Sequence, residues 1–166
     1  EEFGSPDARK GGTFHHYLPD FPRTLRTIGP DSNDSFRVYL LDYFSMGLIG
    51  RHPDTLKPIP ACAKQWAAGP DRKTFYFRLD PDARFSDGEK VNADNYFFTF
   101  FFMRYPPNQA SWYHDFYKKK YENLTKYDDH TLSVTVASAK PDAIEYAGAL
   151  KPTPIAFHRL MGKDYL

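Results

Sequence analysis

Short apolar runs, repeatedly interrupted by proline and glycine, dominate the pattern of this sequence. From Thr131 to Val136 apolar and polar residues alternate, which is the period-2 pattern of a half-buried strand. The run 74–79 combines aromatic and β-branched residues and predicts a strand that is buried on most sides. Further strands are predicted at 13–18, 84–85 and 121–127.

The clearest helix start lies at Asn92. Asparagine is a favourable N-cap, Val91 can pack back onto the helix as a hydrophobic staple, and Asp94 suits the first turn. The helix is expected to run to about Tyr105. Its body is apolar almost all round, so we expect it to be packed on several sides in the core. Shorter helices are predicted at 36–48, 61–67 and 143–150.

Turns and loops occupy much of the remaining chain. Residues 86–88 predict a tight turn with Gly88 at a positive φ angle. Residues 128–130 predict a hairpin turn between two strands, because aspartate favours turns. A loop is expected at 112–114.

The composition fits this mixture of short elements. Apolar residues make up 41% of the 166, and 15 Phe and 12 Tyr supply ample material for a core, while 14 Pro argue against a helical bundle. A chain of this length forms one ordinary domain, or one small domain plus part of another. The predicted fold class is therefore α+β, with short strands around an aromatic core helix.

The charge distribution argues against a nucleic-acid partner. Acidic and basic residues are interspersed, and the formal net charge is +1. The basic run Lys118-Lys119-Lys120 lies between Tyr117 and Tyr121, and basic residues beside aromatic ones can grip a single strand. Three lysines in a polar stretch are more typical of a solvated face. We therefore expect no nucleic-acid partner.

No motif of known catalytic chemistry is found in the sequence. It lacks GxGxxG, a phosphate-binding loop, GxSxG and HExxH. The carboxylates Asp80, Asp82 and Asp87 lie in turns, where solvated side chains are expected rather than a hydrolytic pair. The single cysteine, Cys62, is expected to be a buried packing thiol. We expect no catalytic residue, no metal ligand and no cofactor.

Several motifs occur in an order and at a spacing that resemble one protein family. They are Trp66, Thr74-Phe75-Tyr76-Phe77-Arg78-Leu79, Ala83-Arg84-Phe85-Ser86-Asp87-Gly88, Val91-Asn92-Ala93-Asp94-Asn95 and Pro152-Thr153-Pro154-Ile155. This order resembles the small lobe of the oligopeptide- and dipeptide-binding (family 5) solute-binding proteins of bacterial ABC importers. The start at 10–13 resembles the first strand of the YejA-like branch. Lys90 stands where the family usually has proline.

The resemblance implies a fold and a domain organisation. It implies a small mixed α/β lobe of a two-lobed periplasmic binding protein, with the first strand of the large lobe. Residues 1–35 are then the leader, first strand and connecting loop, and residues 36–166 the small lobe. Because members of the family are much longer, the resemblance also implies an N-terminal fragment. It implies a periplasmic location, although neither a signal peptide nor an apolar run of ~20 residues is visible.

The resemblance also implies a function and a set of ligand-facing residues. The parent protein is expected to capture a peptide and to deliver it to the permease subunits of an ABC importer. Seven residues in two segments are expected to face the ligand: Ile28, Gly29, Pro30, Asp31, Ser32, Trp112 and Tyr113. For Trp112 and Tyr113 the alternative is packing within the lobe. Some members of the family bind nickel complexes, opines or sugars instead.

Two other classes of protein stay open at this point. An aromatic-rich domain with carboxylates in its turns also fits a fragment of a carbohydrate-active hydrolase. A third interpretation is an interaction module unrelated to transport. Neighbouring permease and ATPase genes, with a long C-terminal continuation of the gene, would favour the receptor.

Overall fold

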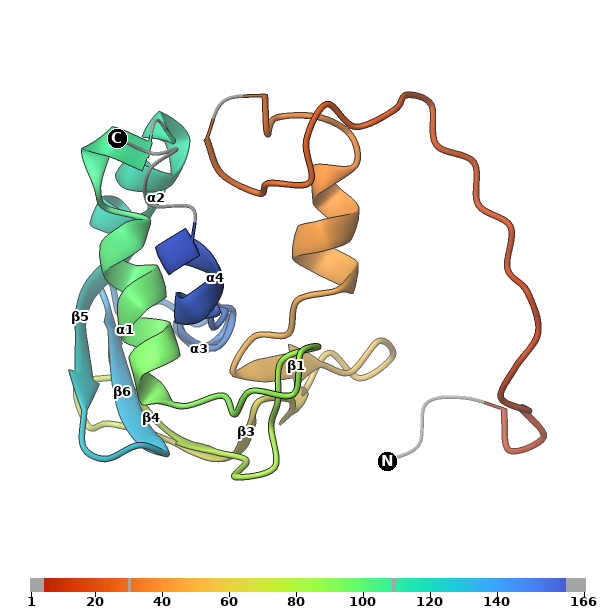
Figure 1. Ribbon diagram of the computed structural model, residues 1–166. Helices are drawn as coiled ribbons and strands as arrows, with labels where there is room; N and C mark the ends of the chain where they lie inside the picture. Colours follow the sequence, from red (N-terminus) through yellow and green to blue (C-terminus); the bar gives the residue numbers. More distant parts are fainter. Residues whose placement is uncertain (1–4, 30, 109, 161–166) are drawn as a thin grey trace.

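A four-stranded antiparallel sheet is the scaffold of the structure, a computed structural model that describes residues 5–29, 31–108 and 110–160 (Figure 1). Its strands are β3 (Ala63–Ala68), β4 (Thr74–Leu79), β5 (Tyr121–Lys126) and β6 (Thr131–Val136). In space the order is β3-β4-β6-β5, so β4 and β6 are the central strands. A separate antiparallel pair is formed by β1 (Ile49–Arg51) and β2 (Pro58–Pro60).

Helices cover the sheet and connect its strands. In the described part of the chain they are the π-helix η1 (Tyr39–Tyr43), α1 (Ala93–Phe102), the 3-10 helix η2 (Pro106–Asn108), α2 (Ser111–Lys120), α3 (Ala143–Gly148) and α4 (Ile155–Leu160). Helix α1 packs against β5, and α3 packs against β6. The N-terminal part of the chain, drawn in red in Figure 1, runs along the outside of the molecule, away from the sheet. This mixture of helix and sheet confirms the predicted α+β class.

The start of α1 is built as the sequence predicts. Oδ1 of Asn92 accepts a hydrogen bond from the backbone N of Asp94 (3.0 Å), and Oδ1 of Asn95 accepts one from the backbone N of Asn92 (2.9 Å). This capping box satisfies two donors at the helix start that have no partner within the helix. The preceding turn also follows the prediction, since Gly88 has a φ of +90°. The helix ends at Phe102, earlier than expected.

One face of the sheet and one stripe of α1 form the hydrophobic core. The buried apolar side chains alternate along the central strands: Phe75, Phe77 and Leu79 on β4, and Leu132, Val134 and Val136 on β6, where Ser133 is buried as well. Tyr96 and Phe100 of α1 are buried as well. The helix is packed on several sides, as expected, by the sheet and by the segment 151–153, but it is not covered all round, because Phe101 is 62% exposed.

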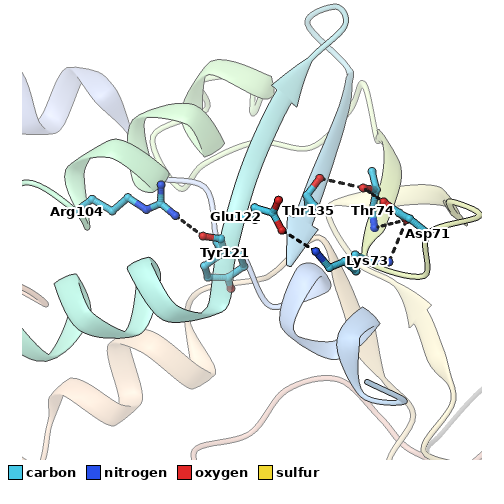
Figure 2. A network of polar contacts seen from close by, with 7 residues as sticks. All are labelled: Asp71, Lys73, Thr74, Arg104, Tyr121, Glu122 and Thr135. Carbon is cyan, nitrogen blue, oxygen red and sulfur yellow. Dashed lines mark hydrogen bonds and ion pairs between the residues drawn. The ribbon is translucent and has the colours of Figure 1, made fainter. Parts of the chain in front are cut away.

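Polar contacts fasten the turn before β4 to the strands beside it (Figure 2). Oδ1 of Asp71 accepts hydrogen bonds from the backbone N of Lys73 (3.0 Å) and of Thr74 (2.9 Å). The Thr74 hydroxyl lies 3.0 Å from Oγ1 of Thr135 on β6, and Nζ of Lys73 forms a 2.8 Å ion pair with Glu122 on β5. The hydrogen bonds from the Thr74 and Lys73 amides lower the pKa of the Asp71 carboxyl, so it is charged at neutral pH.

The helix predicted at 61–67 is wrong, because this part of the chain forms the edge strand β3. Its backbone pairs with β4, with Trp66 opposite Phe77 and Ala67 opposite Tyr76. Alanine, lysine and glutamine favour a helix when local propensity alone decides. Here the pairing with β4 overrides that weak preference.

The loop predicted at 112–114 is also wrong, because these residues form the first turn of α2. Trp112 and Phe116, and likewise Tyr113 and Tyr117, are four positions apart, and each pair of rings lies in contact along the helix. Helix α4, which follows Pro154, was not predicted at all.

The N-terminal predictions need correction as well. Residues 13–18 pair with no other strand in the described chain, and Phe14 and Tyr17 are exposed. A strand needs a neighbour for its backbone groups, so the predicted first strand does not form. The helix predicted at 36–48 is confined to 37–43, and 84–85 contributes only one bridge, from Arg84 to Lys90.

The segment that follows α3 is fastened to α1 by two buried polar side chains. Oγ1 of Thr99 lies 2.9 Å from the carbonyl oxygens of Asn95 and Lys151 and 2.8 Å from Oγ1 of Thr153. Nδ2 of Asn95 donates to the carbonyl of Thr153 (3.1 Å). These contacts hold the outgoing chain against the helix.

We expect Thr99→Val to lower the free energy of unfolding by about 1–2 kcal/mol. Valine keeps the shape of threonine but removes the hydroxyl, so the Lys151 carbonyl loses a buried partner. Urea denaturation of this chain measures the effect, with Thr99→Ser as the control that keeps the hydroxyl. Equal unfolding midpoints for Thr99→Val and wild type would contradict this role for Thr99.

Candidate ligand-binding site

Two adjoining cavities lie beside the start of α2. The first, here called the aromatic cavity, has a volume of about 440 Å³ and lies between the segment 25–28, α2 and the segment 149–154. The second, the loop cavity, has a volume of about 660 Å³ and lies between Gly29, the segment 32–38 and the first residues of α2. Trp112 and Tyr113 line both cavities.

Aromatic rings along α2 form a continuous wall of the aromatic cavity. The ring of Trp112 is stacked on that of Phe116, with centroids 5.1 Å apart, and meets the ring of Tyr113 edge-on at 5.0 Å. Tyr117 and Tyr121 continue the row, with centroids 5.0 Å apart. The indole of Trp112 is 67% exposed, whereas Tyr117 and Tyr121 are buried. The wall therefore offers a large aromatic contact surface whose side chains have little rotamer freedom to lose.

Burial sets the charge state of the titratable groups around the aromatic cavity. It raises the pKa of Tyr117 and of Tyr121 above the ordinary tyrosine range, so both hydroxyls are neutral. It lowers the pKa of His158, so this imidazole is neutral at pH 7. Arg26 and Lys151 supply positive charge, and the described residues that line this cavity include no carboxylate.

Arg104 fixes the end of α2, and with it the aromatic wall (Figure 2). Its Nη2 donates to the backbone carbonyl of Tyr117 (3.0 Å) and to that of Tyr121. Its guanidinium carbon lies 3.8 Å from the centroid of the Phe100 ring. A cation at a helix C-terminus also complements the helix dipole. Arg104 thus acts on the site by holding α2 in place.

The structure brings five of the seven predicted ligand-facing residues to the two cavities. Ile28 lines the aromatic cavity, and Gly29 and Ser32 line the loop cavity. Trp112 and Tyr113 line both, so two segments that are distant in the sequence meet here. Contact of these residues with a ligand stays a prediction.

The other two predicted residues are placed differently. Asp31 lines neither cavity; it is exposed, has a φ of +59° and forms a 3.4 Å ion pair with Arg23. Pro30 lies outside the described residues.

Sequence reasoning missed most of the other residues that line the cavities, including Arg37, Thr99 and Lys151. Arg37 lines the loop cavity, and Thr99 and Lys151 line the aromatic cavity. Arg37 falls where a long helix was predicted, so no local pattern indicates a cavity wall. The family motif at 152–155 lies directly after Lys151, so it indicates that this part of the chain matters. Nothing in that motif indicates Thr99, the residue of α1 that contacts Lys151.

The carboxylates weighed as a hydrolytic pair behave as turn residues. Oδ1 of Asp80 accepts a hydrogen bond from the backbone N of Asp82 (2.9 Å) and forms a 2.9 Å ion pair with Lys64, and Oδ1 of Asp87 accepts a hydrogen bond from the backbone N of Glu89 (3.0 Å). Within the described part of the chain, no group of three His, Cys, Asp or Glu side chains could hold a metal ion. Cys62 is buried, and this burial raises the pKa of its thiol, in line with a packing role.

Comparison with known protein families gives the decisive match. The family model for the bacterial extracellular solute-binding proteins, family 5 Middle, matches residues 57–164. The chain belongs to this family. Family 5 solute-binding proteins are binding proteins of transport systems and not enzymes, which confirms the expectation of no catalytic activity and removes the hydrolase alternative. None of the described helices is long and apolar enough to cross a membrane.

One curated relative and two solved structures illustrate the similarity. The "Probable ABC transporter-binding protein" of Deinococcus radiodurans is 28% identical over 153 residues, which is 89% of this chain and 25% of the relative. A periplasmic oligopeptide-binding protein of Borrelia burgdorferi superposes with a TM-score of 0.66 at 20% identity, over 78% of this chain and 29% of that chain. OppA of Listeria monocytogenes bound to peptide gives a TM-score of 0.65 at 20% identity, over 80% and 29%.

These likenesses establish the fold of this family 5 chain. It resembles part of the periplasmic binding protein fold, as the sequence predicted. The chain spans about a quarter of the length of the curated relative that it matches.

Proposed function

We propose that the gene product is the solute receptor of an ABC-type peptide importer, which captures peptides in the periplasm and delivers them to the permease subunits. Membership of family 5 supports the receptor role. The peptide ligand is supported by two solved neighbours, one an oligopeptide-binding protein and the other bound to peptide. Within this proposal the chain is an N-terminal fragment of the YejA-like branch, with residues 1–35 leading into the large lobe and residues 36–166 forming the small lobe.

The observation that carries the proposal is the meeting of two distant segments at the adjoining cavities. The segment 28–32 and the pair Trp112 and Tyr113 are proposed to face the ligand. Aromatic walls suit a receptor with broad peptide selectivity, because they contact many kinds of side chain at a small entropic cost. A roomy cavity of this kind accepts varied side chains and leaves recognition to the peptide main chain.

Calorimetric titration with pooled random tripeptides tests the proposal on two proteins. The full-length gene product should show saturable binding. The isolated 166-residue chain should show none, because a clamp with one wall cannot enclose a ligand and loses the contacts of the second lobe. Tight binding by the isolated chain would contradict the clamp. A full-length protein that binds a nickel complex, an opine or a sugar and no peptide would contradict the peptide ligand while keeping the receptor role.

A further inference from the structure

Arg37 stands out among the residues that line the loop cavity. Its guanidinium carbon lies 4.7 Å from the centroid of the Tyr113 ring, so the cation rests against the aromatic residue that separates the two cavities. Its Nη1 donates to Oδ1 of Asn33 (3.3 Å). Contact with an aromatic face favours a guanidinium and fixes its orientation. The fork of donors is therefore held in place at the cavity wall.

The charge of Arg37 is not neutralised by an ion pair within the described part of the chain. Among the side chains that the structure describes, no carboxylate lies within 4.0 Å of the guanidinium, and its Nε is buried without a hydrogen-bond acceptor. Asp34 lines the same cavity, but its Oδ1 accepts hydrogen bonds from the backbone N of Phe36 (3.0 Å) and of Arg37 (3.1 Å). Asp34 thus caps the helical turn that carries Arg37 and forms no ion pair with the Arg37 side chain, while its Oδ2 is buried without a hydrogen-bond partner.

A carboxylate is the group that matches this arrangement. Its two oxygens accept two parallel hydrogen bonds from a guanidinium, and such charge-assisted bonds are stronger than those between neutral groups. The first turn of α2 borders the same cavity, and the dipole of a helix favours negative charge near its N-terminus. The Arg37 cation and the helix start therefore both favour a negatively charged ligand group, against the carboxylate of Asp34, which also lines this cavity.

We propose that Arg37 binds a carboxylate of a peptide ligand in the loop cavity, while Trp112 and Tyr113 contact the part of the ligand next to that carboxylate. This inference rests on the proposed peptide-binding function and narrows it to ligands that carry a carboxylate. The carboxylate belongs either to the C-terminus of the peptide or to an acidic side chain.

Four tripeptide pools separate these sources in binding experiments on the full-length gene product. Two pools have free C-terminal carboxyl groups, and the C-termini of the other two are amidated. Within each pair, one pool contains Asp and Glu, and in the other pool these residues are replaced by Asn and Gln. Equilibrium dialysis with mass spectrometry measures how much of each pool is retained. Wild type should retain the pool without any carboxylate at least about tenfold less than the preferred pool. If amidation reduces the retained amount, the bound carboxylate is that of the C-terminus. If replacement of Asp and Glu reduces it, the bound carboxylate is that of an acidic side chain.

Arg37→Gln should abolish this preference by weakening binding of the carboxylate pool about tenfold or more, with the pool lacking carboxylates changed less than about twofold. Arg37→Lys, which keeps the charge but loses the fork, should fall between the two. If wild type retains all four pools equally, or if Arg37→Gln keeps the wild-type preference, the inference is overturned and the peptide-binding function stands. If wild type retains no pool, the proposed function itself fails. If Arg37→Gln does not fold, the comparison of the four pools on wild type still tests whether the ligand needs a carboxylate.

Discussion

Replacing Phe100 by alanine should lower the free energy of unfolding by about 3–5 kcal/mol, whereas the same truncation at Phe101 should lower it by less than about 1 kcal/mol. The two residues are neighbours on α1 and have the same side chain. The ring of Phe100 is 4% exposed and belongs to the core, while that of Phe101 is 62% exposed. Only the first substitution leaves a large cavity between the helix and the sheet.

Urea denaturation of the two variants beside wild type measures this difference. Each variant serves as the matched control for the other, because helix propensity and the loss of volume are the same. Equal and large losses at both positions would contradict the arrangement of α1, since they would require both faces of the helix to be covered. Equal and small losses would mean that α1 does not pack on the sheet.

Trp112→Ala in the full-length gene product should weaken peptide binding by at least about tenfold, because a large aromatic residue at the centre of a contact surface carries much of the binding energy. The substitution should leave folding stability nearly unchanged, since the indole is 67% exposed. Tyr76→Ala is the matched control. Tyr76 is also an exposed aromatic residue, at 40%, but it lies on β4 and lines neither cavity, so affinity should stay within about twofold.

Calorimetric titration of a tripeptide pool onto these two variants measures the affinity of each for peptide. An equal loss of affinity for both would point to a general effect of removing surface aromatic residues. Unchanged affinity for Trp112→Ala would remove the aromatic wall from the proposed binding surface.

Elements whose signals are local were predicted well from the sequence. The alternation of apolar residues in β6 and the aromatic run of β4 each determine a buried face without help from distant residues. The N-cap Asn92 and the turn residue Gly88 act on their own neighbours, and both have the predicted geometry. Such features depend on backbone chemistry within a few residues.

Elements that depend on distant partners were predicted poorly. The segment around Trp66 forms a strand because β4 lies beside it, and Phe101 is exposed because neither the sheet nor the segment 151–153 covers its side of α1. Residues 13–18 have the composition of a strand but find no neighbouring strand in the described chain. Local composition contains no information about which neighbour is present.

The candidate site shows the same contrast between features with a local signal and features that depend on distant parts of the chain. Trp112 and Tyr113 were singled out through the family resemblance, although the helix that carries them was taken for a loop. Arg37 was missed, because its position beside the Tyr113 ring arises from the packing of two segments that are far apart in the sequence. Cavity walls of this kind follow from tertiary structure, and only a motif of known role points to them in advance.

A crystal structure of the full-length gene product with a bound peptide tests the central claim most directly. We predict that the peptide lies within contact distance, about 4 Å, of the Trp112 and Tyr113 side chains and beside the segment 28–32. A peptide bound elsewhere, with Trp112 and Tyr113 packed only against the protein itself, would contradict the proposed binding site.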